Sequence, residues 1–380
     1  MPIRLSFWEQ EAFFEGIDVL VIGSGIVGLN AAITLKERDA KLRVVVIERG
    51  GLPAGASTRN AGFACFGSMT ELLADQEEGE ESAVWSLVEK RWKGLQRLRN
   101  RLGDEAIAYK PWGGYELFRS AEGAEYEKCL HYMPHFNQQL KEITGQPGIF
   151  APASHQQEAF GFAGIAHLIF NKGEGQIHTG KMMKCLVDLA RQKGVEIYNG
   201  ITIDELKTEQ GSVTIKTADD WLLKAQHVIV ATNGFGRQLL PTLAVTPARN
   251  QVLITRPIPQ LKVKGTFHYD RGFFYFRNVG NRLLLGGGRC LDQVGEETAE
   301  FGFTQQIKDA LLQLLTTTIL PDTPFEVEQW WSGIMGVGEQ KKPIVKQLGE
   351  HLTVAVRLGG MGVAIGAEVG EEAARMVWDG

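Results

Sequence analysis

The sequence predicts an α/β protein in which a Rossmann-type domain is interleaved with a smaller α+β domain built on an antiparallel sheet. Residues 17–48 read as an apolar run, a glycine-rich loop, a helix and a second apolar run, which is the pattern of a βαβ unit. Residues 267–289 read as two strands joined by a turn at Gly280-Asn281, which is typical of a hairpin. Residues 354–378 read as a strand, a glycine turn and a helix. These observations favour a Rossmann-type domain combined with an antiparallel sheet.

The composition fits a chain of two domains and excludes several classes of protein. A length of 380 residues exceeds that of one simple domain. The net charge of −5 argues against nucleic acid or an anionic membrane as a partner. No apolar run approaches the roughly 18–20 residues that span a bilayer, and the first residues do not resemble a signal peptide. The four cysteines lie far apart, so we expect no metal site, no disulfides and a cytoplasmic location.

The loop after the first apolar run has the spacing of a dinucleotide-binding turn. It reads Gly23-Ser24-Gly25-Ile26-Val27-Gly28 and leads into a helix that we expect to end near Arg38. Gly23 allows a tight exit from the strand, Gly25 lets a pyrophosphate approach the backbone, and Gly28 lets helix and sheet pack closely. The helix N-terminus supplies N–H groups for the phosphates. Glu48 ends the second run, where a carboxylate can accept both hydroxyls of an adenosine ribose.

The segment after Glu48 favours FAD over a nicotinamide cofactor. Arg49 is followed by the small, hydroxyl-rich stretch Gly55-Ala56-Ser57-Thr58-Arg59-Asn60-Ala61-Gly62-Phe63. This stretch resembles the segment that wraps the pyrophosphate and isoalloxazine in the D-amino-acid oxidase superfamily of FAD-dependent oxidoreductases. Together with Asn233-Gly234 and residues 247–251, it is most similar to the glycine and sarcosine oxidase-like proteins, in the branch that includes gamma-glutamylputrescine oxidase.

The resemblance implies further contacts with FAD from later parts of the chain. Residues 175–203 resemble the second nucleotide-contacting unit of the superfamily, and the turn at 359–362 opens a helix whose N-terminus would face the N1–C2=O edge of the flavin. No motif supports covalent attachment through Cys290, so we expect non-covalent FAD. The expected cofactor-binding residues are Gly23, Ser24, Gly25, Ile26, Val27, Gly28, Glu48, Arg49, Ala56, Ser57, Thr58, Asn60, Ala61, Gly62, Ile203, Ala231, Thr232, Gly234, Gly333, Gly359, Gly360, Met361 and Gly362.

The substrate side of the site is less specific in sequence. The resemblance implies that residues 267–289 roof the substrate pocket, and period-two alternation places Arg271, Phe273, Tyr275 and Arg277 on one face. The arginine and the lysine that relatives carry near the last glycine turn are absent. The pocket candidates are therefore Tyr275, Arg277, Arg249 and Arg59, and the catalytic residues stay unknown. His178 precedes a predicted helix over residues 179–193, which favours a capping role.

The order of the matching segments implies a discontinuous domain design. Residues 1–80, 160–248 and 331–380 would form the FAD-binding domain. Residues 81–159 and 249–330 would form the substrate-binding domain. The charged stretch 71–102 is expected to form surface helices of that second domain, with its basic side chains in solvent.

The resemblance implies oxidation of a small amine or amino acid to an imine, by hydride transfer to flavin N5. Two alternatives stay open. One is an FAD-dependent 2-hydroxy-acid or polyol dehydrogenase of the same fold, and the other is a flavin-binding subunit of a heteromeric complex. The expected partners are a small-molecule substrate and an electron acceptor, which is either O2 or a compound that the sequence does not identify. The oligomeric state stays open.

Overall fold

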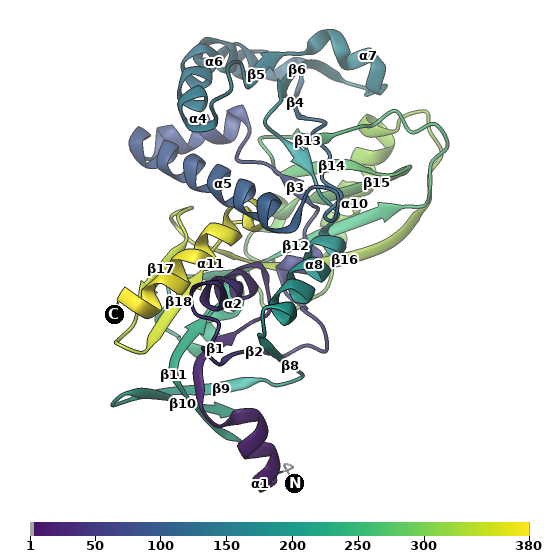
Figure 1. Cartoon of the computed structure of the whole chain (residues 1–380). Coiled ribbons are helices and arrows are strands. Elements are labelled where there is room, and N and C mark those ends of the chain that lie inside the picture. The colour runs from purple at the N-terminus through teal and green to yellow at the C-terminus, as the bar shows by residue number, and fades with distance from the viewer. Residues whose placement is uncertain (1–3, 380) are drawn as a thin grey trace.

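The computed structural model describes residues 4–379, and two large sheets dominate it (Figure 1). The first sheet lies in the lower half of the view, where the chain begins, and the second lies above it. Among the described residues, no helix is long and apolar enough to cross a membrane. The α/β fold class with a second sheet is confirmed.

The first sheet is a parallel sheet with antiparallel additions. Its strand order is β17-β18-β11-β1-β2-β8, and β10 and β9 extend it from β11. Strands β18, β11, β1, β2 and β8 pair in parallel, so their carboxyl ends share one edge. The bounds are β1 (Ile17–Ile22), β2 (Val44–Glu48), β8 (Glu196–Asn199), β9 (Ile203–Glu209), β10 (Ser212–Thr217), β11 (Leu222–Val230), β17 (Ile344–Gln347) and β18 (Leu352–Val356).

Both faces of the first sheet are buried. Along β1, Val19 and Val21 belong to one hydrophobic cluster, whereas Leu20 and Ile22 belong to another. Alternate residues of a strand point to opposite faces, so the continuous apolar run at 17–22 reflects apolar cover on both sides. The predicted βαβ unit is confirmed: helix α2 (Ile26–Arg38) joins β1 to β2.

Four helices pack beside or against one another around this sheet: α2, α5 (Glu81–Leu102), α8 (Thr179–Gln192) and α11 (Gly362–Asp379). Glycines allow the close approach of α5 and α2 to α11. A Cβ on Gly94 of α5 would overlap Ala364 O, and one on Gly370 of α11 would lie 2.6 Å from Val27 O. Such spacing leaves no room for a side chain, so the helices meet backbone to backbone.

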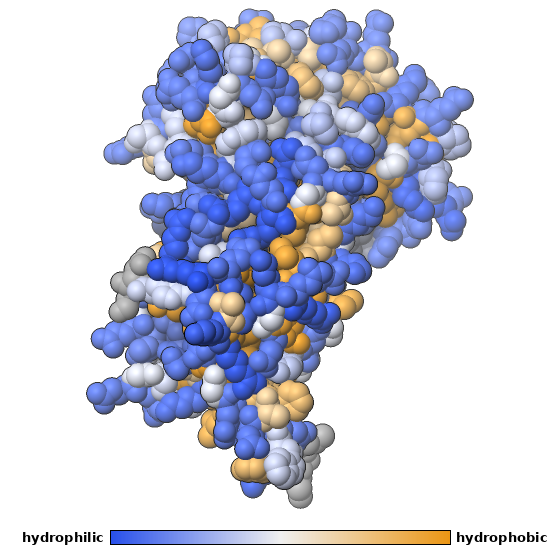
Figure 2. Space-filling view, viewed as in Figure 1, coloured by the Kyte–Doolittle hydropathy of each residue, from blue (hydrophilic) through white to orange (hydrophobic). Residues whose placement is uncertain are grey.

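The prediction that the basic side chains of the charged stretch 71–102 lie in solvent was wrong for several of those in α5, whereas the assignment of α5 to the second domain stays a prediction. Lys90 and Arg97 form ion pairs with Glu372 and Glu368 of α11, and Arg101 pairs with Glu37 of α2. Figure 2 shows a mainly hydrophilic surface over these helices. The basic residues lie on one stripe of α5 at helical spacing, and sequence alone does not reveal what that stripe faces.

The second sheet is mainly antiparallel and has the order β16-β12-β15-β14-β13-β4-β6-β5. The predicted hairpin is confirmed, with Arg277 opposite Leu284 in the pair β14–β15. Phe267, Phe276 and Leu285 face an apolar core under α10. The bounds are β4 (Gly114–Arg119), β5 (Phe150–Pro152), β6 (Ile165–Asn171), β12 (Thr246–Thr255), β13 (Thr266–Tyr269), β14 (Phe274–Val279), β15 (Arg282–Gly287) and β16 (Val327–Val337).

The remaining elements connect and cover these sheets. A short ladder pairs β3 (Phe63–Ala64) with β7 (Gly175–Gln176). The connecting helices and turns are α1 (Phe7–Glu9), η1 (Gln10–Phe14), α3 (Ala56–Arg59), α4 (Met69–Glu78), η2 (Ser120–Glu122), α6 (Gly123–Thr144), η3 (Ser154–Gln156), α7 (Gln157–Phe160), η4 (Asn233–Phe235), α9 (Gly236–Leu239), η5 (Arg289–Asp292), α10 (Gln305–Leu314) and η6 (Leu315–Ile319).

The division into domains stays a prediction, and the sheets indicate where its boundaries would move. Strand β6, placed with the FAD-binding domain by the sequence, pairs with β4 and β5 of the second sheet. Strand β16 crosses the predicted boundary at residue 331 and pairs with β12 along its length. By hydrogen bonding, both strands belong to the second sheet.

Candidate active site

The glycine-rich turn between β1 and α2 forms the first wall of a large cavity. A Cβ on Gly23 would lie 2.9 Å from Ala231 O, and one on Gly28 would overlap Gly23 O. Gly23 also has φ of +104°, which side chains disfavour. The turn thus brings backbone N–H groups and the N-terminus of α2 to the cavity, an arrangement suited to phosphate oxygens.

Glu48 ends β2 at the same edge of the sheet. Its Oε2 accepts hydrogen bonds from the Ser24 amide at 3.1 Å and the Ser24 hydroxyl at 2.8 Å, and Oε1 accepts one from the Gly50 amide at 3.0 Å. These donors fix the direction of a carboxylate that is itself 7% exposed and lines the cavity. Ser24 does not line the cavity itself, but its hydrogen bonds hold the Glu48 carboxylate in position.

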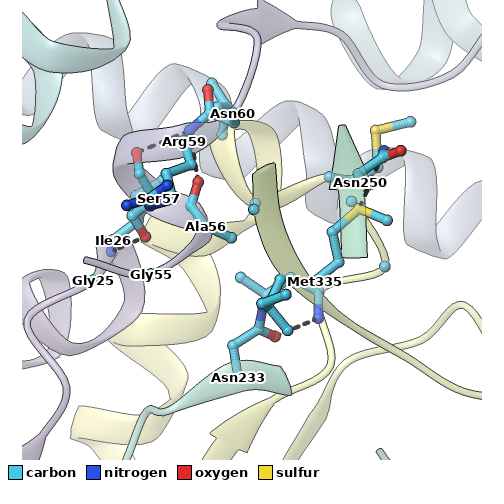
Figure 3. A pocket seen from close by; sticks show the side chains of 18 of the residues that line it. Gly25, Ile26, Gly55, Ala56, Ser57, Arg59, Asn60, Asn233, Asn250 and Met335 are labelled. Carbon is cyan, nitrogen blue, oxygen red and sulfur yellow. Dashed lines mark hydrogen bonds between the residues drawn. The ribbon is translucent and has the colours of Figure 1, made fainter. Parts of the chain in front are cut away.

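The second wall is the predicted wrapping segment, which stabilises its own conformation (Figure 3). Asn60 donates to Ser57 O at 2.8 Å and accepts from the Gly62 amide at 2.9 Å. Ser57 Oγ accepts from the Ile26 amide at 2.9 Å, which joins the segment to the first turn of α2. The Thr58 hydroxyl donates to Pro53 O at 2.7 Å. The small residues thus build a compact turn, and each hydroxyl or amide has an internal partner.

The last wall is the glycine turn that precedes α11. Asn233 Oδ1 accepts from the amides of Arg357 at 3.1 Å and Leu358 at 3.3 Å, and so joins the ends of β11 and β18. Gly359 and Gly360 have positive φ, and they orient the chain so that the N-terminus of α11 opens on the cavity. A helix N-terminus carries partial positive charge and favours a neighbouring anion.

One face of the second sheet roofs the cavity. Asn250 and Val252 of β12, His268 of β13, and Phe273 and Tyr275 line it. Gly286 lies opposite Tyr275, and a Cβ there would meet the phenol ring at 2.7 Å, so this glycine leaves room for the ring. Tyr275 is partly buried, and burial raises the pKa of its phenol well above the usual value.

A buried ion pair supports the roof at His268. Its Nε2 lies 3.0 Å from Glu174 Oε2, and Glu174 also accepts from the Thr266 hydroxyl at 2.8 Å. Burial alone would lower the pKa of His268, but the Glu174 carboxylate outweighs it and raises the pKa to about 9. The pair is therefore imidazolium and carboxylate at neutral pH. The Cys65 thiol lies in the same cluster, and burial raises its pKa well above the usual value.

These walls and the roof enclose one cavity of about 810 Å³. Most of the cofactor-binding residues expected from sequence line it. Four do not, and each has a structural task instead: Ser24 holds Glu48, Gly28 packs helix on strand, Thr58 closes its own turn, and Gly234 packs against Met335 O. The role of the others as cofactor ligands stays a prediction.

The four pocket candidates are not equivalent. Tyr275 lines the cavity in the roof. Arg59 also lines it, but donates to Ala54 O at 3.2 Å and to Ser332 O at 3.0 Å, and stacks on Phe301. Arg249 forms an ion pair with the buried Glu296 at 2.9 Å and is not among the residues that line the cavity.

Arg277 connects the roof to the wrapping segment and is also outside the set of lining residues. Its Nε donates to Ala61 O, and its Nη2 donates to Ile177 O at 3.1 Å. Burial lowers the pKa of its guanidinium to about 10. His178 has the predicted capping role, because Nδ1 accepts from the Lys181 amide at 3.2 Å at the start of α8.

Sequence reasoning missed several lining residues, chiefly on the roof. His268 lies on a predicted strand and Asn250 lies in a stretch without a predicted strand. The direction in which each side chain points depends on registers that join strands far apart in sequence. Arg289, at the end of the predicted hairpin, was not among the pocket candidates, and the structure places it on the cavity wall. Phe273 and Tyr275 were placed on one face of the hairpin by period-two alternation, and both line the cavity.

The residues present fit FAD. The cavity joins a phosphate-binding turn, a fixed carboxylate and a helix N-terminus to an aromatic and apolar roof. Such an arrangement suits a long ligand with a ribose and a pyrophosphate at one end and a flat ring at the other. The fold and cavity together define a class: enzymes of dinucleotide-dependent redox chemistry.

Comparison with known families makes this assignment specific. The family model described as FAD dependent oxidoreductase (DAO) matches residues 18–376. The chain therefore belongs to this family, its cofactor is FAD, and it is an oxidoreductase.

Curated relatives are distant in sequence. A probable oxidoreductase OrdL of Rhizobium meliloti is 26% identical, over 92% of this chain and 80% of that protein. The bifunctional protein ThiO/ThiG of Trichormus variabilis is 24% identical over 86% of this chain, and this chain spans 47% of its length. The gamma-glutamylputrescine oxidoreductase of Escherichia coli is 25% identical over 71% of this chain and 64% of that protein.

Solved structures share the fold at low identity. Iminodiacetate oxidase from Chelativorans sp. superposes with a TM-score of 0.75 at 20% identity, over 95% of each chain. Glycine oxidase from Geobacillus kaustophilus superposes with a TM-score of 0.74 at 20% identity, over 95% of this chain and 94% of that one. These likenesses confirm the architecture and leave the substrate to be argued from the cavity.

Proposed function

We propose that this chain oxidises the CH–NH bond of a small amine or amino acid to an imine. The observation that carries the proposal is the continuity of the cavity, which runs from the phosphate-binding turn to a roof of side chains. A substrate in the roofed part would lie against the ring end of the cofactor. The relatives include enzymes named for oxidation of amines and amino acids.

The chain would hold the cofactor by its backbone and a few fixed side chains. The amides of the turn at 23–28 and the N-terminus of α2 would bind the pyrophosphate, and Glu48 would bind the ribose. The N-terminus of α11 would stabilise negative charge at the ring end. Bound FAD supplies the hydride acceptor, which the resemblance places at flavin N5. Cys290 does not line the cavity, which supports non-covalent binding.

The roof would orient the substrate and exclude water. Phe63 and Tyr275 pack edge to face with ring centroids 5.6 Å apart, and Val252 lies in the same cluster. Apolar cover of this kind strengthens the charge interactions inside a cavity. It also favours a neutral amine, which must carry a lone pair to form the C=N bond as the α-hydrogen leaves. Water would hydrolyse the released imine.

The test is anaerobic reduction of the purified protein by a panel of compounds. Amines, N-methyl amino acids, D-amino acids and 2-hydroxy acids are added in turn, and the visible flavin bands are recorded. Bleaching by amines or amino acids supports the proposal. Bleaching by 2-hydroxy acids alone would refute the substrate class and favour the alternative dehydrogenase. If no compound bleaches the isolated chain, the flavin-binding subunit becomes the better hypothesis.

A further inference from the structure

Arg289 is unlike the other cationic side chains that line the cavity. Among the described residues, no carboxylate forms an ion pair with it, and Nη1 is buried without a hydrogen-bond partner. A guanidinium whose buried N–H groups lack acceptors is costly unless a ligand supplies them. The site is therefore incomplete at this point without an acceptor.

The other cations of the cavity already have partners. Arg271 pairs with Glu125 at 2.9 Å, and Lys341 pairs with Asp75. Arg49 lies at the ribose end, where it donates to Gln238 Oε1 at 3.3 Å and stacks on Phe235 at 3.7 Å.

The chain turns tightly to place Arg289 on the wall. Gly287 and Gly288 have φ of +113° and +76°, and a Cβ on Gly287 would overlap Phe273 O. The Gly288 amide donates to Phe273 O at 2.9 Å, which attaches the turn η5 to the roof. Arg289 and Gln293 then follow one helical turn apart, and both line the cavity.

Asn250 adds a second polar group, of which the oxygen lacks a donor. Its Oδ1 is buried without a partner, and its Nδ2 lies 3.9 Å from Met335 Sδ, a weak acceptor (Figure 3). Asn250 is one position beyond the register pair Gln251–Gly287, which places it beside the glycine turn that leads to Arg289. The roof thus ends in a guanidinium with an unpaired nitrogen, Nη1, and a carboxamide with an unpaired oxygen, Oδ1.

We propose that Arg289 binds a carboxylate of the substrate. The substrate would then be an amino acid or an N-substituted amino acid rather than a simple amine. A guanidinium binds a carboxylate through two parallel hydrogen bonds, whereas the unpaired Asn250 Oδ1 is an acceptor and would take a hydrogen bond from an N–H group of the same substrate. This inference rests on the proposed function, and it assigns the anchor to the turn after β15, not to the stretch 333–340, which contains no arginine.

Binding of acetate to the FAD-loaded protein tests the anchor without any reaction. Acetate is titrated against the visible flavin spectrum, with acetamide as its uncharged analogue. We expect acetate to perturb the spectrum and acetamide to bind far more weakly. Arg289→Gln should weaken acetate binding by at least about 30-fold, and Arg289→Lys should retain part of it. Arg256→Gln removes an arginine that is outside the lining residues and pairs with Glu326, so acetate binding should not change.

Paired substrates test the same anchor during turnover. Proline and prolinamide, and sarcosine and its amide, are compared by their rates of anaerobic flavin bleaching. The wild-type protein should prefer the acid of each pair that reacts, and Arg289→Gln should abolish that preference while the amide reacts at its original rate. FAD content and the thermal midpoint of each variant show that it is folded.

The outcomes separate the two proposals. Equal acetate affinity in the wild-type and Arg289→Gln proteins, or no acetate binding to the wild-type protein, overturns the anchor. Failure of every amine and amino acid to bleach the flavin overturns the proposed function, while the acetate titration still decides whether Arg289 binds a carboxylate.

Discussion

The walls of the cavity and its roof are built by different means. The walls consist of glycine turns, backbone amides and helix N-termini, drawn from residues 23–28, 55–62 and 359–362. The roof consists of side chains that project from one face of the second sheet. A ligand held by backbone requires particular conformations, whereas a ligand held by side chains requires particular residues at a given register. The walls thus suit a constant cofactor, and the roof suits a variable substrate.

Replacement of a wall glycine should have the largest effect. In Gly28→Ala the new methyl group would overlap Gly23 O, so helix α2 cannot keep its distance from the turn. Overpacking costs about 1–3 kcal/mol, and a clash with backbone costs more. We expect little soluble protein, and no FAD in what remains, as measured by soluble yield and the visible spectrum.

Gly51→Ala is the matched control for this change. Gly51 is exposed, and nothing lies within 4 Å of the point that a Cβ would occupy there. Its yield and FAD content should equal those of the wild-type protein. Normal FAD content in Gly28→Ala would show that the wall accepts a side chain at this glycine. The walls would then not depend on backbone conformation more than the roof does.

Arg277 connects the roof to the walls, and its loss should have the next largest effect. Arg277→Met leaves Ala61 O and Ile177 O without their donor. Each unsatisfied buried acceptor costs about 1–3 kcal/mol, so the free energy of unfolding should fall by roughly 2–6 kcal/mol. Denaturant unfolding measures this loss, and FAD affinity should also fall because Ala61 and Gly62 line the cavity.

Arg277→Lys distinguishes geometry from charge. Lysine keeps the charge but lacks the planar set of donors that reaches both carbonyls. We expect most of the destabilisation to persist. A lysine variant as stable as the wild-type protein would mean that charge alone holds the roof to the walls.

The same contrast explains what could be predicted from sequence. The walls depend on local patterns such as Gly23, Gly25 and Gly28, where a required conformation selects the residue type. The βαβ unit was therefore predicted, and most of the cofactor-binding residues expected from sequence line the cavity. The roof depends on pairings such as Phe267 with Tyr115, which join residues far apart in the chain. A one-residue change of register would turn every side chain of a strand to the opposite face of the sheet, and no local sequence pattern determines the register.

The basic stripe of α5 shows a related limit. Its spacing predicted an exposed helix, because charge at helical spacing is typical of a solvated face. The acidic partners Glu368 and Glu372 lie on the last helix of the chain, and no local signal links the two segments. Similarly, Arg277 lies two residues after Tyr275 and was therefore expected to face the pocket. It lies further along β14, where its side chain binds Ala61 O in the wrapping segment instead.

The ion pair beneath the roof should make stability depend on pH. The folded pKa of His268 is about 9, above its unfolded value of 6.5, so the charged form stabilises the folded state. This contribution is complete below about pH 6.5 and is lost as the pH rises through about 9. Its size is roughly 3 kcal/mol. Urea unfolding from about pH 6 to pH 10 should show it as a loss of stability in the wild-type protein.

His268→Gln provides the comparison. Glutamine can still donate to Glu174 but does not titrate, so the stability difference between the two proteins should shrink as the pH rises. A difference that stays constant over this range would mean that His268 is neutral in the folded protein, and the roof would then carry no fixed charge at this point.

The smallest effect is expected where α5 covers α11, the helix that completes the last wall. Arg97 donates to Glu368 at 3.0 Å and also pairs with Glu371, but its side chain is 32% exposed. Exposed pairs contribute about 0.2–1 kcal/mol, so Arg97→Ala should lower the free energy of unfolding by less than about 1 kcal/mol. Because α5 and α11 also meet at Gly94, where backbones touch, packing and not charge should hold this cover in place. In the same denaturant unfolding experiment, Gly94→Ala should therefore lower the free energy of unfolding more than Arg97→Ala does. A larger loss in Arg97→Ala would mean that ion pairs, not packing, hold α5 against α11.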